Sequence, residues 1–193
     1  MKSPLRSVRR RAVDLLADCR GIAATEFAVI VPIMLVMFFG TVEFSSGVAV
    51  DAKVTLMART LSDLTSRSIK MNDSDKDNFI AASTAIMAPY PSAPTRATIS
   101  ELYVDPTTLA ARVQWSKGSA PRAVSSTVTI PPQLAVGDTY LIFSEVSYRY
   151  VPTVGYVMAF SGVNLSDVSY TRPRQSVCVF YSPATESDPC PKL

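Results

Sequence analysis

The chain has 193 residues, enough for one modest domain and an appendage. It is 48% hydrophobic and 18% charged, and the apolar excess is concentrated between residues 22 and 42. The net charge is +3, but six basic and two acidic residues lie within residues 1–21, so the remainder is slightly acidic. The basic character therefore belongs to the N-terminal tail and gives no reason to expect a nucleic-acid partner.

Residues 22–42 form an apolar run directly after this basic leader, residues 1–21. As a helix the run would be about 31 Å long, which matches a hydrocarbon core of about 30 Å. A basic flank before the run and a near-neutral flank after it place the leader in the cytoplasm and the C-terminal part outside. We therefore expect a single-pass membrane protein.

The helix is expected to continue beyond the membrane, because no proline occurs in residues 43–70. Apolar residues recur there at spacings of three and four, which is typical of an amphipathic helix. They are Val50, Val54, Met57, Leu61 and Leu64. The pattern predicts one helix over residues 22–68, roughly 70 Å long, whose apolar stripe packs on the globular part of the chain.

Residues 71–94 are expected to hold a second, short helix and a proline-rich connector. Asp73, Ser74 and Asp75 are plausible N-caps, since small polar and acidic side chains suit the positive end of a helix. The helix is predicted over residues 75–88, and the prolines that follow would end it.

In residues 95–193 the hydrophobic period changes to two, which indicates an antiparallel sheet. Residues 97–105 and 108–116 flank Pro106 and predict a hairpin. Alternate side chains between Tyr140 and Tyr150 share one face, which makes residues 138–151 the strongest strand prediction. Further strands are expected at 155–162, 163–172 and 176–182. The sequence thus predicts an α+β fold in which a sheet of five or six strands packs on the long helix.

Two of the three cysteines, Cys178 and Cys190, lie in the exported part, while Cys19 lies in the leader. Export favours a disulfide between the pair, because that compartment is oxidising. Closing a loop of this size would stabilise the fold by about 3 kcal/mol on the chain-entropy model. Two buried free thiols are the alternative.

Common catalytic and metal-binding patterns are missing from the chain. It has no histidine, no paired CxxC, no glycine-rich phosphate loop and no nucleophile elbow. Asp73, Asp75 and Asp77 resemble the start of a calcium loop. However, Asn78 and Thr84 stand where such a loop needs glycine and glutamate. We expect neither an enzyme nor a cofactor, but a protein that binds or assembles.

One carboxylate, Glu26, lies inside the apolar run. If the chain were cut after Gly21, Ile22 would become the N-terminus, and Glu26 and Phe27 would be its fifth and sixth residues. A free α-amine and a carboxylate one helical turn apart can neutralise each other or pair between subunits, as an ionisable group in lipid requires. The alternative is that Glu26, about 7 Å inside the helix start, snorkels to the cytoplasmic interface.

We also predict the position of one residue of the helix and the effect of another. Glu43 is expected at the outer membrane interface, without a chemical role. Pro32 removes the hydrogen bond to the carbonyl of Ala28 and would kink or loosen the helix.

The leader and the start of the apolar run resemble the prepilin leader of type IV pilin-like proteins: basic residues, a glycine, a glutamate, an aromatic residue and a long apolar helix. The segment from residue 21 to about residue 67 is more narrowly similar to the TadE/TadG family of tight-adherence (Flp) pilus assembly proteins. The positions that carry the resemblance are Gly21, Ala24, Glu26, Ala28, Pro32, Gly40, Glu43, Ala58 and Arg59.

The resemblance implies a minor pilin or pseudopilin in the bacterial inner membrane, with its C-terminal domain in the periplasm. It also implies a pilin-like architecture, in which a long helix carries a β-rich head. Such proteins are cut by an aspartic prepilin peptidase, here between Gly21 and Ile22. They work with other pilins and with the pilus secretion platform.

Two alternatives stay open. The chain could be a permanently anchored envelope protein whose β-domain binds a ligand or a cell-wall component. It could also be a secreted binding protein with a signal peptide cut after Gly47-Val48-Ala49, although the apolar run is long for a signal peptide and contains an acid.

Overall fold

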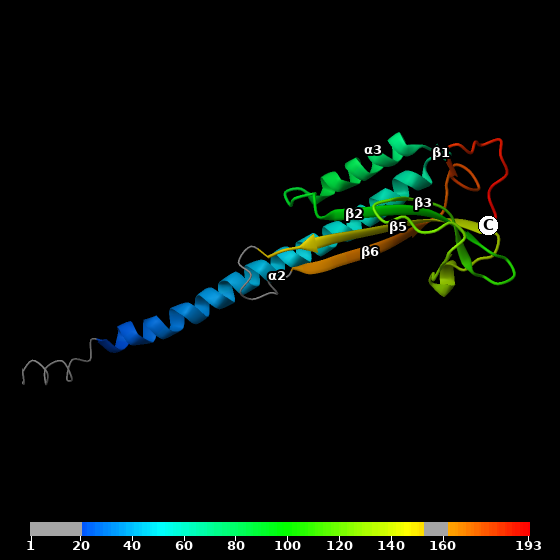
Figure 1. The fold of residues 1–193 in the computed structure, drawn as a ribbon. Helices are drawn as coiled ribbons and strands as arrows, with labels where there is room; N and C mark the ends of the chain where they lie inside the picture. The colour runs from blue at the N-terminus through cyan, green and yellow to red at the C-terminus, as the bar shows by residue number, and fades with distance from the viewer. Residues whose placement is uncertain (1–20, 153–161) are drawn as a thin grey trace, which may run out of the picture.

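The computed structural model describes residues 21–152 and 162–193 and has the predicted α+β fold, a long helix that carries a β-rich head (Figure 1). The helices are α2 (Ile22–Ser66), α3 (Asp73–Thr84) and the short η2 (Ala85–Met87) and η3 (Pro132–Leu134). The strands are β1 (Lys70–Met71), β2 (Thr95–Val104), β3 (Ala111–Gly118), β4 (Thr127–Val128), β5 (Thr139–Tyr150), β6 (Val163–Thr171) and β7 (Phe180–Tyr181).

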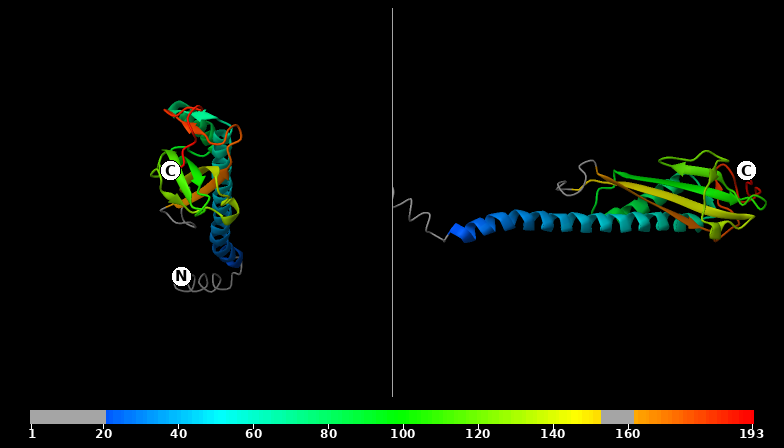
Figure 2. Two further views of the ribbon diagram at one scale, coloured as in Figure 1. Left: turned by 90° about the vertical axis from the view of Figure 1, so that its right-hand side faces the viewer. Right: turned by 90° about the horizontal axis from the view of Figure 1, so that it is seen from below.

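Helix α2 is a single helix of 45 residues, as the sequence predicts. Pro32 lies inside it without ending it. The helix ends where the backbone N–H of Arg67 donates to the Leu64 carbonyl and that of Ser68 donates to the Thr65 carbonyl. Its N-terminal half projects away from the head, and its C-terminal half lies along the sheet (Figure 2).

The main sheet has five strands in the order β4-β3-β2-β5-β6, and all neighbours are antiparallel. The predicted hairpin is confirmed as β2 and β3, with a register shift between Glu101 and Leu102. The predicted strands at 138–151 and 163–172 are confirmed as β5 and β6. Nearly all of the strand predicted at 155–162 lies outside the described residues.

The prediction that residues 176–182 add a strand to this sheet is wrong. Only Phe180–Tyr181 is a strand, and it pairs in parallel with β1 in a separate two-stranded sheet. The backbone just before it is bonded to side chains instead of to a strand. The N–H of Val179 donates to the Glu101 carboxylate, and its carbonyl accepts from the Trp115 indole.

Helices α2 and α3 lie on one face of the sheet and enclose the main core with it. The predicted stripe supplies Val50, Val54, Met57 and Leu61, which are all fully buried, while Leu64 is half-buried. The sheet supplies apolar side chains from β2 and β5, which are Ala97, Ile99, Ile142, Val146, Tyr148 and Tyr150.

Helix α3 begins and ends earlier than the sequence predicts. Its N-cap is Asn72, and none of the three expected residues caps it. The Asn72 side chain accepts from the Asp75 N–H at 2.9 Å, and the Asp75 carboxylate accepts from the Asn72 N–H at 3.1 Å. This reciprocal capping box satisfies two N–H groups at the start of the helix. The helix ends at Thr84 and tightens into η2.

Candidate functional site

The four residues of the predicted processing signal lie at the free end of α2. Gly21 is the N-cap, no side chain caps the helix there, and a Cβ built on Gly21 would meet nothing within 4 Å. Glu26 is exposed, and Phe27 is 69% exposed. The backbone of Ile22 lies four positions, about one helical turn, before Glu26 in the same helix. An amine created at Ile22 would therefore lie near the Glu26 carboxylate.

The N-terminal half of α2 presents large apolar side chains that no described residue of the head covers. The helix is long and apolar enough to cross a membrane. The exposed apolar residues of this half include Phe27, Val29, Ile30, Ile33, Met34, Leu35, Val36, Met37, Phe38 and Phe39. This surface suits lipid or other apolar helices.

An apolar ridge continues past residue 42 on the side of α2 that faces away from the sheet. It consists of Phe44, Val48, Ala52 and Leu56, which recur every four residues and are all exposed. The ridge ends where Arg59 and Asp63 follow. The ridge was not predicted from the sequence, where the stripe that starts at Val50 is the stronger helical pattern. The four-residue spacing would have revealed it.

Glu43, which we expect at the outer membrane interface, is covered by the protein. Only 3% of it is exposed. Glu43 lies close enough to Tyr150 that its charge contributes to raising the pKa of the Tyr150 hydroxyl, after the larger effect of burial. A signal existed in the sequence, since extending the buried stripe backward from Val50 by three and then four residues reaches Gly47 and Glu43. The buried face of α2 therefore starts seven residues earlier than predicted.

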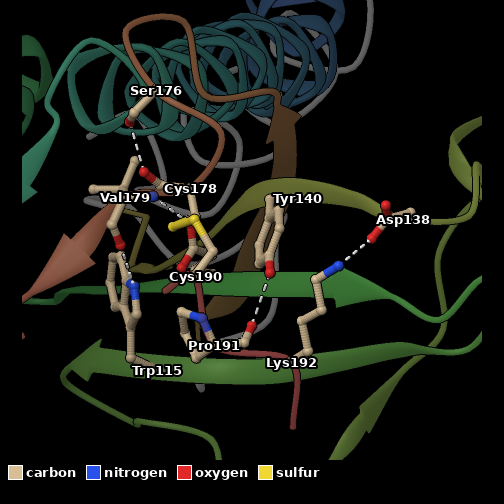
Figure 3. The surroundings of a disulfide bond; sticks show 10 residues. Trp115, Asp138, Tyr140, Ser176, Cys178, Val179, Cys190, Pro191 and Lys192 are labelled. Carbon is tan, nitrogen blue, oxygen red and sulfur yellow. Dashed lines mark hydrogen bonds and ion pairs between the residues drawn. A yellow bond between two sulfur atoms is a disulfide. The ribbon is translucent and has the colours of Figure 1, made fainter. Parts of the chain in front are cut away.

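The C-terminal segment, residues 174–193, ties the far end of α2 to the sheet. Cys178 and Cys190 form a disulfide within it (Figure 3). Arg174 forms an ion pair with Asp63 at 2.8 Å, and its N–H donates to the Ser66 carbonyl.

Further bonds fix the C-terminal segment to the strands. The Tyr140 hydroxyl donates to the Pro191 carbonyl, and Lys192 pairs with Asp138 at 2.6 Å (Figure 3). The C-terminal segment thus covers the end of the head that lies beside the C-terminal end of α2.

Glu101 is a fully buried carboxyl beneath this segment. Its Oε1 accepts from the Val179 N–H at 2.6 Å. Burial raises the pKa of Glu101 to about 8, although the bond from Val179 opposes the shift. At neutral pH the protonated form of Glu101 is therefore favoured. Through its bond to Val179, this side chain of β2 fixes the C-terminal segment to the sheet. No local sequence pattern predicts this bond, because the two residues are 78 positions apart.

The opposite face of the sheet carries a polar hollow of about 380 Å³. Arg122 and Glu145 form a bidentate ion pair across it, with both contacts at 2.7 Å. Arg96, Thr98, Ser147 and Ser166 also line it. No group of three or more His, Cys, Asp or Glu within residues 21–152 and 162–193 is arranged to hold a metal ion.

Residues 21–61 match the family model described as TadE-like protein, which confirms the family resemblance for this segment. The match starts at Gly21 and includes the whole apolar run and most of the buried stripe. No curated protein and no solved structure matches the chain. The match indicates involvement in tight-adherence pilus assembly and an N-terminal helix of the membrane type.

Proposed function

We propose that this chain is a pseudopilin of a tight-adherence (Flp) pilus system. In this proposal α2 crosses the bacterial inner membrane once, with the leader in the cytoplasm and the head in the periplasm. A prepilin peptidase cuts the chain between Gly21 and Ile22. The observation that carries the proposal is the arrangement of Gly21, Glu26 and Phe27 at the exposed start of a helix that matches the TadE-like family.

The helix also offers a surface for other pilins. Its head-proximal half buries one face on the sheet and leaves the apolar ridge of Phe44, Val48, Ala52 and Leu56 exposed. Exposed apolar residues at helical spacing are what a neighbouring helix needs for packing. We propose that this ridge and the membrane half pack against other pilins and the secretion platform, and that the cut amine of Ile22 pairs with Glu26.

In this proposal the head performs no catalysis and binds no cofactor. Several of its charged residues form structural pairs. Arg174 forms an ion pair with Asp63 near the end of α2, and Lys192 forms one with Asp138 beside the C-terminus. The buried carboxyl of Glu101 serves the C-terminal segment. These interactions stabilise the folded head, which supports a structural role for it in the pilus system.

Processing is tested by Gly21→Arg. A bulky cation in place of the glycine obstructs the backbone that a membrane-edge protease must reach, so we expect the variant to accumulate at its uncut length. Ala17→Arg adds the same charge four residues upstream and is the matched control, which we expect to be cut normally. The measurement is the mass of the purified protein. Normal cutting of Gly21→Arg would contradict the role assigned to Gly21.

A second candidate function is supported by the polar hollow beside the Arg122–Glu145 pair. In that case the chain would stay anchored at Met1, and the hollow would bind a ligand or a cell-wall component. Arg122→Ala separates the two, because it opens the hollow without touching α2. Unchanged pilus assembly in this variant supports the pseudopilin, whereas loss of a cell-wall interaction supports the alternative.

A further inference from the structure

The head reaches down α2 to the end of the predicted membrane span. Glu43 is 3% exposed and lies one residue past residue 42, where that span ends. Glu43 lies close enough to Tyr150 of the head to affect its pKa, whereas Phe44, about 100° further around the helix, is exposed at the same level. The cover over Glu43 therefore comes from the head side. No length of bare helix separates the head from the bilayer that the span would cross.

Strand β5 descends along α2 toward the membrane. Near its middle, the Ser144 hydroxyl donates to the Ala58 carbonyl at 2.6 Å. At its end, the Tyr150 ring lies 3.7 Å from the position that a Cβ on Gly47 would occupy. From Ser144 to Tyr150 the contacted helix position thus moves eleven residues toward the N-terminus. Strand β6 starts at the same level, since Val163 pairs with Tyr150.

The height of this strand end follows from the helix rise. Gly47 is five residues past residue 42, so it lies about 7.5 Å beyond the hydrocarbon core at 1.5 Å per residue. The headgroup layer of one leaflet is about 5–7 Å thick. Tyr150 therefore lies at the outer edge of the headgroups, and Val151 continues the strand's path toward the lipid.

The composition at the strand end suits contact with lipid. Val151 is 58% exposed, and Val163 on the paired strand is half-buried. No charged residue occurs in the sequence between Arg149 and Asp167. An uncharged, apolar strand end is costly in water and favourable at a bilayer surface.

We propose that the lower rim of the head, formed by the exposed Val151 and the half-buried Val163 beside buried Tyr150, contacts the periplasmic surface of the same bilayer that α2 crosses. The inference rests on the membrane anchoring in the proposed function. The protein then touches the membrane at two points, the span and the rim, and the head is held in one orientation. The apolar ridge of α2 consequently faces in a direction parallel to the membrane plane, where a neighbouring pilin can contact it.

Tryptophan quenching by lipid tests this contact. The full chain is reconstituted into two kinds of phosphatidylcholine vesicle, one spin-labelled at the headgroup and one brominated at shallow acyl carbons, with buried Trp115 as the constant background. Three exposed valines are replaced one at a time: Val151→Trp at the rim, Val36→Trp in the span, and Val136→Trp near the start of β5, at the opposite end of the head. We expect the added emission to be lost at 151 with the headgroup quencher, lost at 36 with the acyl-chain quencher, and retained at 136 with both. Val163→Trp repeats the rim measurement.

The other results overturn the proposal in distinguishable ways. Quenching at 36 without quenching at 151 or 163 would leave the anchor intact and remove the rim contact. No quenching at 36 would remove the anchor and the rim contact together. Blue-shifted but unquenched emission at 151 would mean that another protein chain, and not lipid, covers the rim.

Discussion

The two leucines Leu61 and Leu56 lie on the same helix, and the structure assigns them opposite roles. Leu61 is fully buried against the sheet, whereas Leu56 is 52% exposed on the apolar ridge. Truncating a buried leucine to alanine costs about 2–5 kcal/mol, because burial is lost and a cavity remains. An exposed truncation changes stability by about 0.5 kcal/mol or less. Leucine and alanine are both good helix formers, so the comparison isolates packing.

The assay is urea unfolding of the full chain in detergent, followed by brief proteolysis of the unfolded head. A head of typical stability has about 5–15 kcal/mol, so Leu61→Ala should shift the midpoint strongly and Leu56→Ala hardly at all. In cells we expect Leu56→Ala to reduce co-purification with other pilins while the head stays folded. Equal losses of stability in the two variants would refute the assignment of the two helix faces.

Two further predictions concern the C-terminal segment. Replacing both Cys178 and Cys190 by alanine should lower the free energy of unfolding by about 3 kcal/mol on the chain-entropy model, measured by the same urea assay. Reduction of the parent protein with dithiothreitol should reproduce the loss, and an unchanged midpoint after reduction would contradict it. The pKa of Glu101 rises from its ordinary value of 4.5 to about 8 on folding, so the folded state holds this proton more tightly and stability should fall as pH rises between those values. Glu101→Gln keeps the acceptor for Val179 and should be more stable than the parent at pH 9 but not at pH 5; parallel pH profiles would rule this out.

The sequence predicted the parts of the fold that depend on local periodicity. Helix α2 follows from an apolar run that continues without proline into a stripe at three- and four-residue spacings. Strand β5 follows from alternation between Tyr140 and Tyr150. The fold class needed only these patterns, because a helix and a sheet that each have an apolar face must pack together.

Contacts between residues far apart in the chain could not be predicted from the sequence. The bond between Glu101 and Val179 joins residues 78 positions apart, and nothing near either residue indicates the other. The same holds for β7, whose parallel partner β1 lies more than one hundred residues earlier. Glu43 differs, because its burial follows from the stripe once the stripe is extended past Val50. Its position at the end of the apolar run favours a different interpretation, in which a charged side chain lies at the membrane interface.

The proposed processing site is tested most directly by the N-terminal sequence of the mature protein, purified from the membranes of cells that assemble the pilus. The account predicts a chain that starts at Ile22, with Glu26 as its fifth residue. A chain that still starts at Met1 while the peptidase is active would contradict processing, and a start at Val50 would replace the anchored pseudopilin by a secreted protein.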